Sequence, residues 1–312
     1  MYQTPLKVFS LINKCYASTT FINKYSIVLL TGKIIIKGIL MMTIFSKNDK
    51  HVVIRGSGDI ATGVAVRLHH CGYKVIMTDI ALPTMIRCSV SFGQCLYGES
   101  STVEGITATK ANNLEEVATI LAQQQIPVII DAYLNITKAL KVNYLVDAIL
   151  AKSNLGTKKT MAPITIALGP GFEAGKDCDA VIETSRGHYL GRVIYTGYTL
   201  PNSGIPGNIA GFTYERVVRS PCAGTVQRFA NIGDIVKQGD VIAQVDTAPV
   251  YAPLSGMVRG LINEGLNVEA KFKIADIDPR GEKADYTTVS DKARAIGGSV
   301  LEAMLHLALK HQ

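Results

Sequence analysis

The chain has 312 residues, of which 47% are hydrophobic and 18% charged, so it can bury a sizeable core and is not disordered throughout. The formal net charge is +7, but residues 1–50 hold seven lysines and one aspartate, which leaves +1 for residues 51–312. A body this close to neutral lacks the basic footprint that binds a phosphate backbone. We therefore expect no nucleic-acid partner.

The cysteines and histidines of the chain show neither a redox motif nor a metal-binding motif. There are six of each, without a CxxC pair and without the spacing typical of zinc ligands. A chain of this length needs no disulfides to fold. We expect reduced cysteines, a cytoplasmic location and no metal site.

The first fifty residues include the most apolar stretch, residues 25–42. Lys33 and Lys37 interrupt it, and a lysine at the centre of a membrane helix costs about 2.5–3.5 kcal/mol. No convincing signal cleavage site follows. We expect residues 1–50 to be an extension, disordered or upstream of a start at Met41 or Met42, and we expect no stable membrane span. A membrane-peripheral segment and a true span stay open as alternatives.

The segment 51–79 predicts a strand, a glycine-rich turn, a helix and a second strand. Residues 51–55 and 74–79 are apolar runs, and residues 60–70 have helical spacing. The turn carries Gly56, Gly58 and Ala61 in the G-x-G-x-x-A form of the dinucleotide-binding pattern, and Asp79 ends the second strand 21 residues after Gly58. In that pattern the glycines allow the tight turn and the approach of a pyrophosphate, and the acid accepts bonds from ribose.

Asp59 complicates this interpretation. It follows Gly58 directly, so its carboxylate suits the positive end of a helix but repels a nearby phosphate. The alternative is an α/β fold that keeps the tight turn and binds no dinucleotide, with Asp59 capping its own helix. Both interpretations stay open.

Strands and helices continue to alternate up to residue 183. Asn113 and Glu116 resemble the start of a helix, and apolar runs at 126–131, 144–149, 164–168 and 180–183 predict buried strands. This pattern predicts a Rossmann-like parallel sheet with helices on both faces over residues 51–213. Ligands bind beyond the carboxyl ends of such strands, so the candidate binding residues there include Gly169, Gly171, Arg186 and His188.

A self-comparison at a spacing of 32 residues reveals a repeat in the next segment. It pairs Pro221 with Pro253 and Gly233 with Gly265, among other positions. The unit resembles the biotinyl/lipoyl-type barrel-sandwich hybrid, which implies that fold for residues 214–280. The expected hairpin at 245–249 has no lysine, so we expect no covalent biotin or lipoate. Residues 281–312 predict a closing helix that packs on the α/β domain.

Seven stretches together resemble one narrow family, the YqeB-type accessory proteins of selenium-dependent molybdenum hydroxylase systems. The resemblance spans residues 51–312 and rests on 55–63, 151–157, 168–175, 181–193, 202–207, 276–281 and 290–303. It implies a role in maturing a molybdenum hydroxylase, with that enzyme or its cofactor-maturation proteins as partners. It supplies no catalytic residue.

The resemblance leaves the ligand and any catalysed reaction open. The candidate ligands are a dinucleotide and a molybdopterin nucleotide, and the candidate binding residues are Gly56, Gly58, Asp59, Ala61, Asp79, Gly169, Gly171, Arg186 and His188. Two other functions compete with maturation: an NAD(P)-dependent oxidoreductase, against which Asp59 counts, and a non-catalytic docking scaffold.

Overall fold

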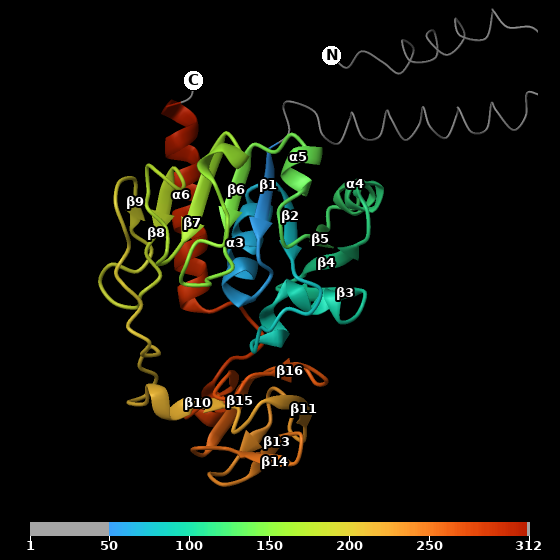
Figure 1. Ribbon diagram of the computed structural model, residues 1–312, viewed down its shortest axis with the longest axis vertical. Helices are drawn as coiled ribbons and strands as arrows, with labels where there is room; N and C mark the ends of the chain where they lie inside the picture. Colours follow the sequence, from blue (N-terminus) through green and yellow to red (C-terminus); the bar gives the residue numbers. More distant parts are fainter. Residues whose placement is uncertain (1–49, 311–312) are drawn as a thin grey trace, which may run out of the picture. The chain divides into compact units, whose positions relative to one another are not determined.

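The structure is a computed structural model that describes residues 50–310. Its larger part is a mixed α/β fold around a nine-stranded sheet with the order β3-β4-β5-β2-β1-β6-β7-β8-β9 (Figure 1). The strands are β1 (His51–Arg55), β2 (Lys74–Asp79), β3 (Ser100–Val103), β4 (Ile106–Ala111), β5 (Ile126–Ile130), β6 (Tyr144–Asp147), β7 (Ile164–Leu168), β8 (Ala180–Ile182) and β9 (Val193–Ile194). The interior pairs are parallel, while β3–β4 and β8–β9 are antiparallel.

The four helices of the described residues are α3 (Asp59–His70), α4 (Leu114–Ala122), α5 (Ile136–Ala139) and α6 (Asp291–Lys310). Helix α4 begins where the sequence predicts, because the Asn113 side chain accepts a hydrogen bond from the Glu116 N–H at 2.9 Å. The predicted strand 144–149 is shorter than expected. Beyond Asp147 the chain leaves the sheet, and the Asp147 carboxylate accepts a hydrogen bond from the Ile149 N–H.

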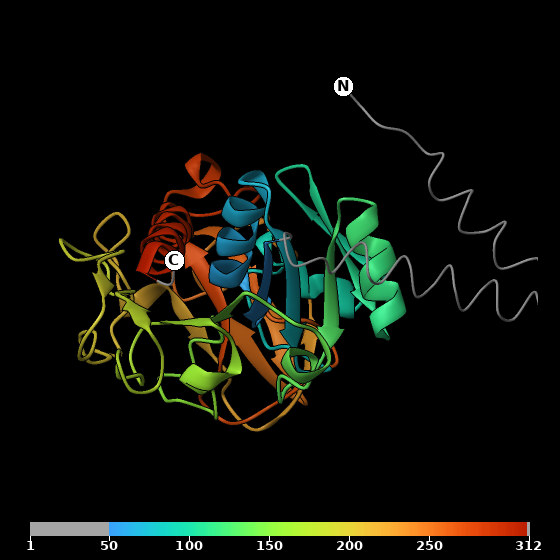
Figure 2. The same ribbon diagram turned by 90° about the horizontal axis from the view of Figure 1, so that it is seen from above.

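Helices α3 and α6 lie side by side, although they come from opposite ends of the described chain (Figure 2). Glycine makes this contact possible: a Cβ atom on Gly297 would lie 2.8 Å from the Gly63 carbonyl oxygen, and one on Gly63 would lie 2.5 Å from the Cβ of Ala293. Both helices share one apolar core with β1, β2 and β7. The glycine at position 297 therefore has a packing role.

The second part, here called the β module, contains two four-stranded sheets. Their orders are β10-β17-β15-β12 and β14-β13-β11-β16. The strands are β10 (Val217–Arg219), β11 (Gly224–Arg228), β12 (Ile235–Val236), β13 (Val241–Val245), β14 (Ala248–Tyr251), β15 (Gly256–Leu261), β16 (Asn267–Val268) and β17 (Lys273–Asp278). The starts of β11, β12 and β13 recur 32 residues later as the starts of β15, β16 and β17, which matches the repeat found in the sequence.

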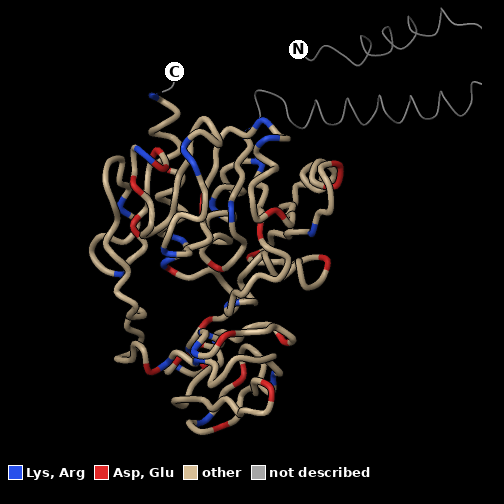
Figure 3. Tube along the Cα trace, in the orientation of Figure 1, with Lys and Arg blue, Asp and Glu red and all other residues tan. Residues whose placement is uncertain are grey.

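The β module has its own apolar core and also bonds to the sheet part. The Leu261 N–H donates to the Ile86 carbonyl at 2.8 Å, and the Gln94 and Asn263 amides bond to each other. Figure 3 shows both acidic and basic residues where the sheet part and the β module meet. The prediction for residues 1–50 falls outside the described residues, except at Lys50. Within residues 50–310, no helix is both long enough and apolar enough to cross a membrane.

Candidate functional site

A cavity of about 450 Å³, here called the glycine-loop crevice, lies at the carboxyl ends of three neighbouring strands. Its walls come from the loops that follow β1, β2 and β6, namely residues 56–60, 79–85 and 148–155. Strand β1 pairs with β2 on one side and β6 on the other, so the chain order reverses at this point. A reversal of this kind is where open α/β sheets bind ligands.

Gly56 and Gly58 shape the crevice in different ways. Gly56 has a φ of +101°, and a Cβ atom there would lie 3.0 Å from the backbone of Ala148, so it serves the tight turn. Gly58 has ordinary extended backbone, and a Cβ atom on it would approach only Met85, at 3.8 Å. Both Gly58 and Met85 line the crevice. Ala61 is buried in the core that α3 shares with the sheet, as close helix–strand packing requires.

Asp79 ties the glycine loop to the end of β2. Its Oδ2 accepts hydrogen bonds from the Ser57 N–H at 2.7 Å and the Ser57 hydroxyl at 2.5 Å, and its Oδ1 accepts one from the Ile80 N–H. Burial raises the pKa of Asp79 above its ordinary value, while these hydrogen bonds oppose the rise. The side chain lines the crevice and keeps acceptor capacity on Oδ1 for a ligand hydroxyl.

Asp59 does not cap its own helix, contrary to the alternative drawn from the sequence. The N-cap of α3 is Gly58, and no side chain bonds to the end of the helix. The Asp59 side chain instead lines both the crevice and a second, larger cavity. The two cavities therefore adjoin at this carboxylate, and the N-terminal N–H groups of α3 keep their hydrogen-bonding capacity.

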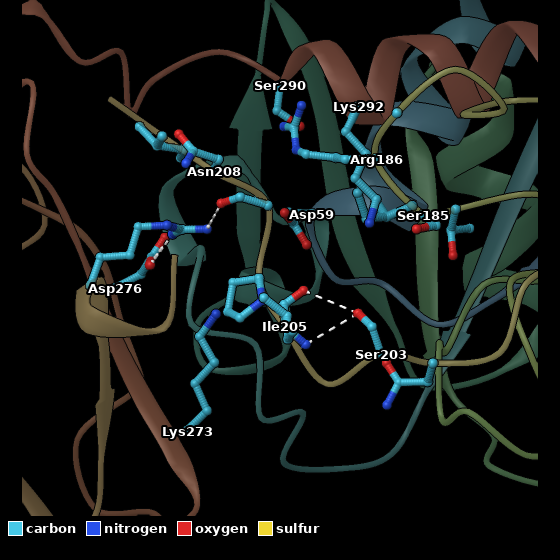
Figure 4. Close-up of a pocket in the computed structure, with 18 of the residues that line it drawn as sticks. Asp59, Ser185, Arg186, Ser203, Ile205, Asn208, Lys273, Asp276, Ser290 and Lys292 are labelled. Carbon is cyan, nitrogen blue, oxygen red and sulfur yellow. Dashed lines mark hydrogen bonds and ion pairs between the residues drawn. The ribbon is translucent and has the colours of Figure 1, made fainter. Parts of the chain in front are cut away.

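The second cavity, here called the junction cavity, has a volume of about 780 Å³ and lies between the sheet part and the β module (Figure 4). Basic side chains predominate among its charged groups: Arg87, Arg186, Arg216, Arg259, Lys273 and Lys292 face Asp59, Glu183 and Asp276. The β module supplies Arg259 from β15 and Lys273 from β17. The cavity therefore suits an anion.

Some of these charges are already neutralised. Arg186 makes a bidentate pair with Asp291 at 2.7 and 2.8 Å, and Arg216 pairs with Asp276. The carboxylate of Glu183 is buried and accepts hydrogen bonds from the N–H groups of Ser185 and Leu200, both at 2.7 Å. These three groups shape the wall of the junction cavity.

Three residues predicted to bind a ligand lie elsewhere. Neither cavity is lined by Gly169, Gly171 or His188, although Pro170 lines the junction cavity. His188 is exposed and contacts the Tyr189 ring edge-on, with the ring centroids 5.0 Å apart. Of residues 183–188, which follow β8, all except His188 line the junction cavity.

Gly171 has a structural reason to be glycine. Its φ is +107°, and a Cβ atom would lie 2.5 Å from the Cα of Ser153. We expect Gly171→Ala to lower the free energy of unfolding by about 1–3 kcal/mol in urea denaturation. Gly197→Ala is the control, because Gly197 has a φ of +90° and open space around it. Equal losses in the two variants would contradict the role of the close backbone contact.

Sequence reasoning missed the role of Arg55 at the end of β1. Its guanidinium donates to Asp147 at 3.2 Å, to the Thr157 hydroxyl at 2.9 Å and to the carbonyls of Ala132 and Leu155. Leu155 lines the glycine-loop crevice, so Arg55 holds one of its walls. A basic residue that ends an otherwise apolar strand and precedes a glycine loop was the available signal.

No metal-binding group is present among residues 50–310: no three His, Cys, Asp or Glu side chains gather closely enough to hold an ion. The five cysteines in this range are free thiols. Burial raises the pKa of Cys95 and that of Cys178 to about 12, which makes both thiols unreactive at neutral pH.

The fold and the cavities define an α/β protein with two adjoining cavities at the carboxyl edge of its sheet. Over 270 residues the chain is 55% identical to YqeB, an uncharacterized protein of Escherichia coli (strain K12), and the match covers 86% of this chain and 50% of YqeB. Over the matched residues the chain is similar to YqeB, and it spans about half the length of this curated relative. No family model matches the chain.

Solved structures give weaker similarities. An aspartoacylase family protein of Mesorhizobium loti is 12% identical with a TM-score of 0.24, over 74% of this chain and 85% of that one. The ectoine utilization protein EutE (DoeB) of Ruegeria pomeroyi is 11% identical with a TM-score of 0.22, over 73% of this chain and 85% of that one. Scores this low carry no argument about function.

Proposed function

We propose that this chain binds a nucleotide or a nucleotide-containing cofactor in the glycine-loop crevice, as an accessory protein that matures a selenium-dependent molybdenum hydroxylase. The ligand is a dinucleotide or a molybdopterin nucleotide, and the partner is the hydroxylase or one of its cofactor-maturation proteins, in the cytoplasm. In this proposal residues 51–213 form a Rossmann-like domain, 214–280 a barrel-sandwich hybrid and 281–312 the closing helix.

The observation that carries the binding proposal is the combination of groups in the crevice. Gly58 leaves room beside Met85, the end of α3 is uncapped, and the Asp79 carboxylate lines the same cavity. These groups suit, in turn, the close approach of a ligand, the charge of a phosphate and the hydroxyls of a ribose. The maturation role itself rests on the family resemblance.

The oxidoreductase alternative requires a pyrophosphate at the start of α3, beside Asp59. That carboxylate lines both cavities. It interacts electrostatically with Lys273 and Lys292, the two lysines whose pKa is lowered by burial. A ligand whose phosphate reaches toward these lysines avoids the repulsion. The docking-scaffold alternative needs no small ligand at all.

A thermal-shift panel on the full chain separates the three functions. The panel contains NAD, NADP, ATP, S-adenosylmethionine and a molybdopterin dinucleotide. Stabilisation by the molybdopterin dinucleotide supports the proposal. A response to NAD or NADP alone favours the oxidoreductase, and no response to any ligand favours the scaffold.

The hairpin of the β module predicts an unmodified chain. Strands β13 and β14 join through Asp246 and Thr247, and the Asp246 carboxylate accepts a hydrogen bond from the Thr225 N–H at 2.8 Å. This position therefore offers a structural carboxylate and no amine. We expect intact-mass spectrometry of the protein from its native host to give the mass of the unmodified chain. A lipoyl or biotinyl increment would overturn this expectation.

A further inference from the structure

The junction cavity holds arginine side chains with buried nitrogen atoms that make no hydrogen bond. Arg87 is 7% exposed, and its Nε and one terminal nitrogen are buried without a hydrogen bond. The Nε of Arg259 is also buried without a hydrogen bond. Its nearest carboxylate is that of Asp278, 3.7 Å away, which already pairs with Arg280 at 2.6 Å. Buried donors of this kind are rarely left without a partner, which is water, an ion or a ligand where the protein supplies none.

Two lysines add further positive charge to the junction cavity. Burial lowers the pKa of Lys273 and that of Lys292 below the ordinary 10.5. Asp276, the acid that most strongly opposes this shift for Lys273, is already paired with Arg216. Both lysines line the same cavity as Asp59, and Figure 4 labels all three around one space. Both lysines share Asp59, and Arg259 shares Asp278 with Arg280. These shared carboxylates leave an excess of positive charge on the four cations.

We propose that Arg87, Arg259, Lys273 and Lys292 form a phosphate-binding site in the junction cavity, separate from the glycine-loop crevice. Guanidinium and ammonium groups from several directions suit a tetrahedral oxyanion that carries about two charges. A cavity of about 780 Å³ also accommodates the organic part of a phosphate-bearing molecule. Because Arg259 and Lys273 belong to the β module, the module completes the site.

The test uses inorganic pyrophosphate as the probe and isothermal titration calorimetry of the full chain. We expect wild type to bind pyrophosphate. Lys273→Met and Arg259→Met should each raise the Kd for pyrophosphate about tenfold or more, through the loss of a charge-assisted hydrogen bond. Lys237→Met is the matched control, because Lys237 is an exposed lysine of the same module. It leaves the Kd unchanged.

Stability of the unliganded protein separates binding from a structural role. Lys273→Met removes a half-buried cation for which no hydrogen bond or ion pair is found, so the melting temperature without pyrophosphate stays the same or rises. A lysine that held the fold together would lower it. Loss of pyrophosphate binding together with a lower melting temperature in both variants would therefore overturn the proposal.

A final comparison distinguishes this site from the one in the proposed function. Gly58→Val obstructs the glycine-loop crevice and leaves pyrophosphate binding intact if the phosphate site is separate. The same variant with ADP in place of pyrophosphate shows whether a bound nucleotide extends from one cavity into the other. Absence of pyrophosphate binding in wild type, or wild-type affinity in both module variants, contradicts the phosphate site without affecting the crevice.

Discussion

Gly58→Val is expected to abolish nucleotide binding while leaving the fold intact. The backbone of Gly58 is extended, with φ of −71°, and a Cβ atom there meets nothing closer than Met85 at 3.8 Å. The valine side chain therefore fits the free protein but occupies the crevice where a ligand would approach. Calorimetric titration with the ligand identified in the panel should show no binding, and the melting temperature should remain near that of wild type.

The control for this variant is Gly98→Val, because Gly98 has open space around it and lies outside both cavities. Asp79→Asn probes a second group that lines the crevice. The loss of charge-assisted hydrogen bonds to ribose should weaken binding by about 1–3 kcal/mol. If both crevice variants bind every nucleotide as wild type does, the nucleotide site is not in this crevice.

Arg55→Met is expected to lower the free energy of unfolding by about 3–5 kcal/mol, since it leaves the carboxylate of Asp147 buried without its counter-charge. Asp147 is fully buried, and Arg55 is 8% exposed. The Thr157 hydroxyl also donates to Asp147 at 2.5 Å, but a hydroxyl supplies no positive charge. Chemical denaturation of wild type and variant measures the effect.

An exposed ion pair provides the comparison for Arg55. Arg294 pairs with Glu104 at 2.5 Å, and its side chain is 49% exposed, so Arg294→Met should cost only about 0–1 kcal/mol. The double variant Arg55→Met/Asp147→Asn should recover part of the stability lost in Arg55→Met, because the unpaired buried charge of Asp147 is gone. A loss in Arg55→Met no larger than that in Arg294→Met would show that the buried network does not stabilise the fold.

Local patterns predicted much of the fold. The apolar strands of the sheet, the Asn113 cap and the 32-residue repeat all depend on residues close in sequence or on a regular spacing, and the structure agrees with each. Strand β3 was missed because Ser100–Val103 is mostly polar and lies at the edge of the sheet. An edge strand needs no apolar run on both faces.

The candidate site was predicted only in part, for a physical reason. Gly56, Gly58 and Asp79 follow a short motif whose spacing is visible in the sequence. Arg87 and Arg259 lie far apart in the chain and meet only because the β module packs against the loop that precedes η1 (Cys88–Val90). His188 lies outside both cavities, since a position after a strand does not determine the direction in which the loop then turns.

The most direct test of the central claim is the activity of the molybdenum hydroxylase in the native host with and without this protein. The proposal predicts that deletion leaves the hydroxylase polypeptide present but inactive. It also predicts that wild type restores the activity, that Gly98→Val does so equally, and that Gly58→Val does not. Hydroxylase activity unchanged by the deletion would contradict the maturation role.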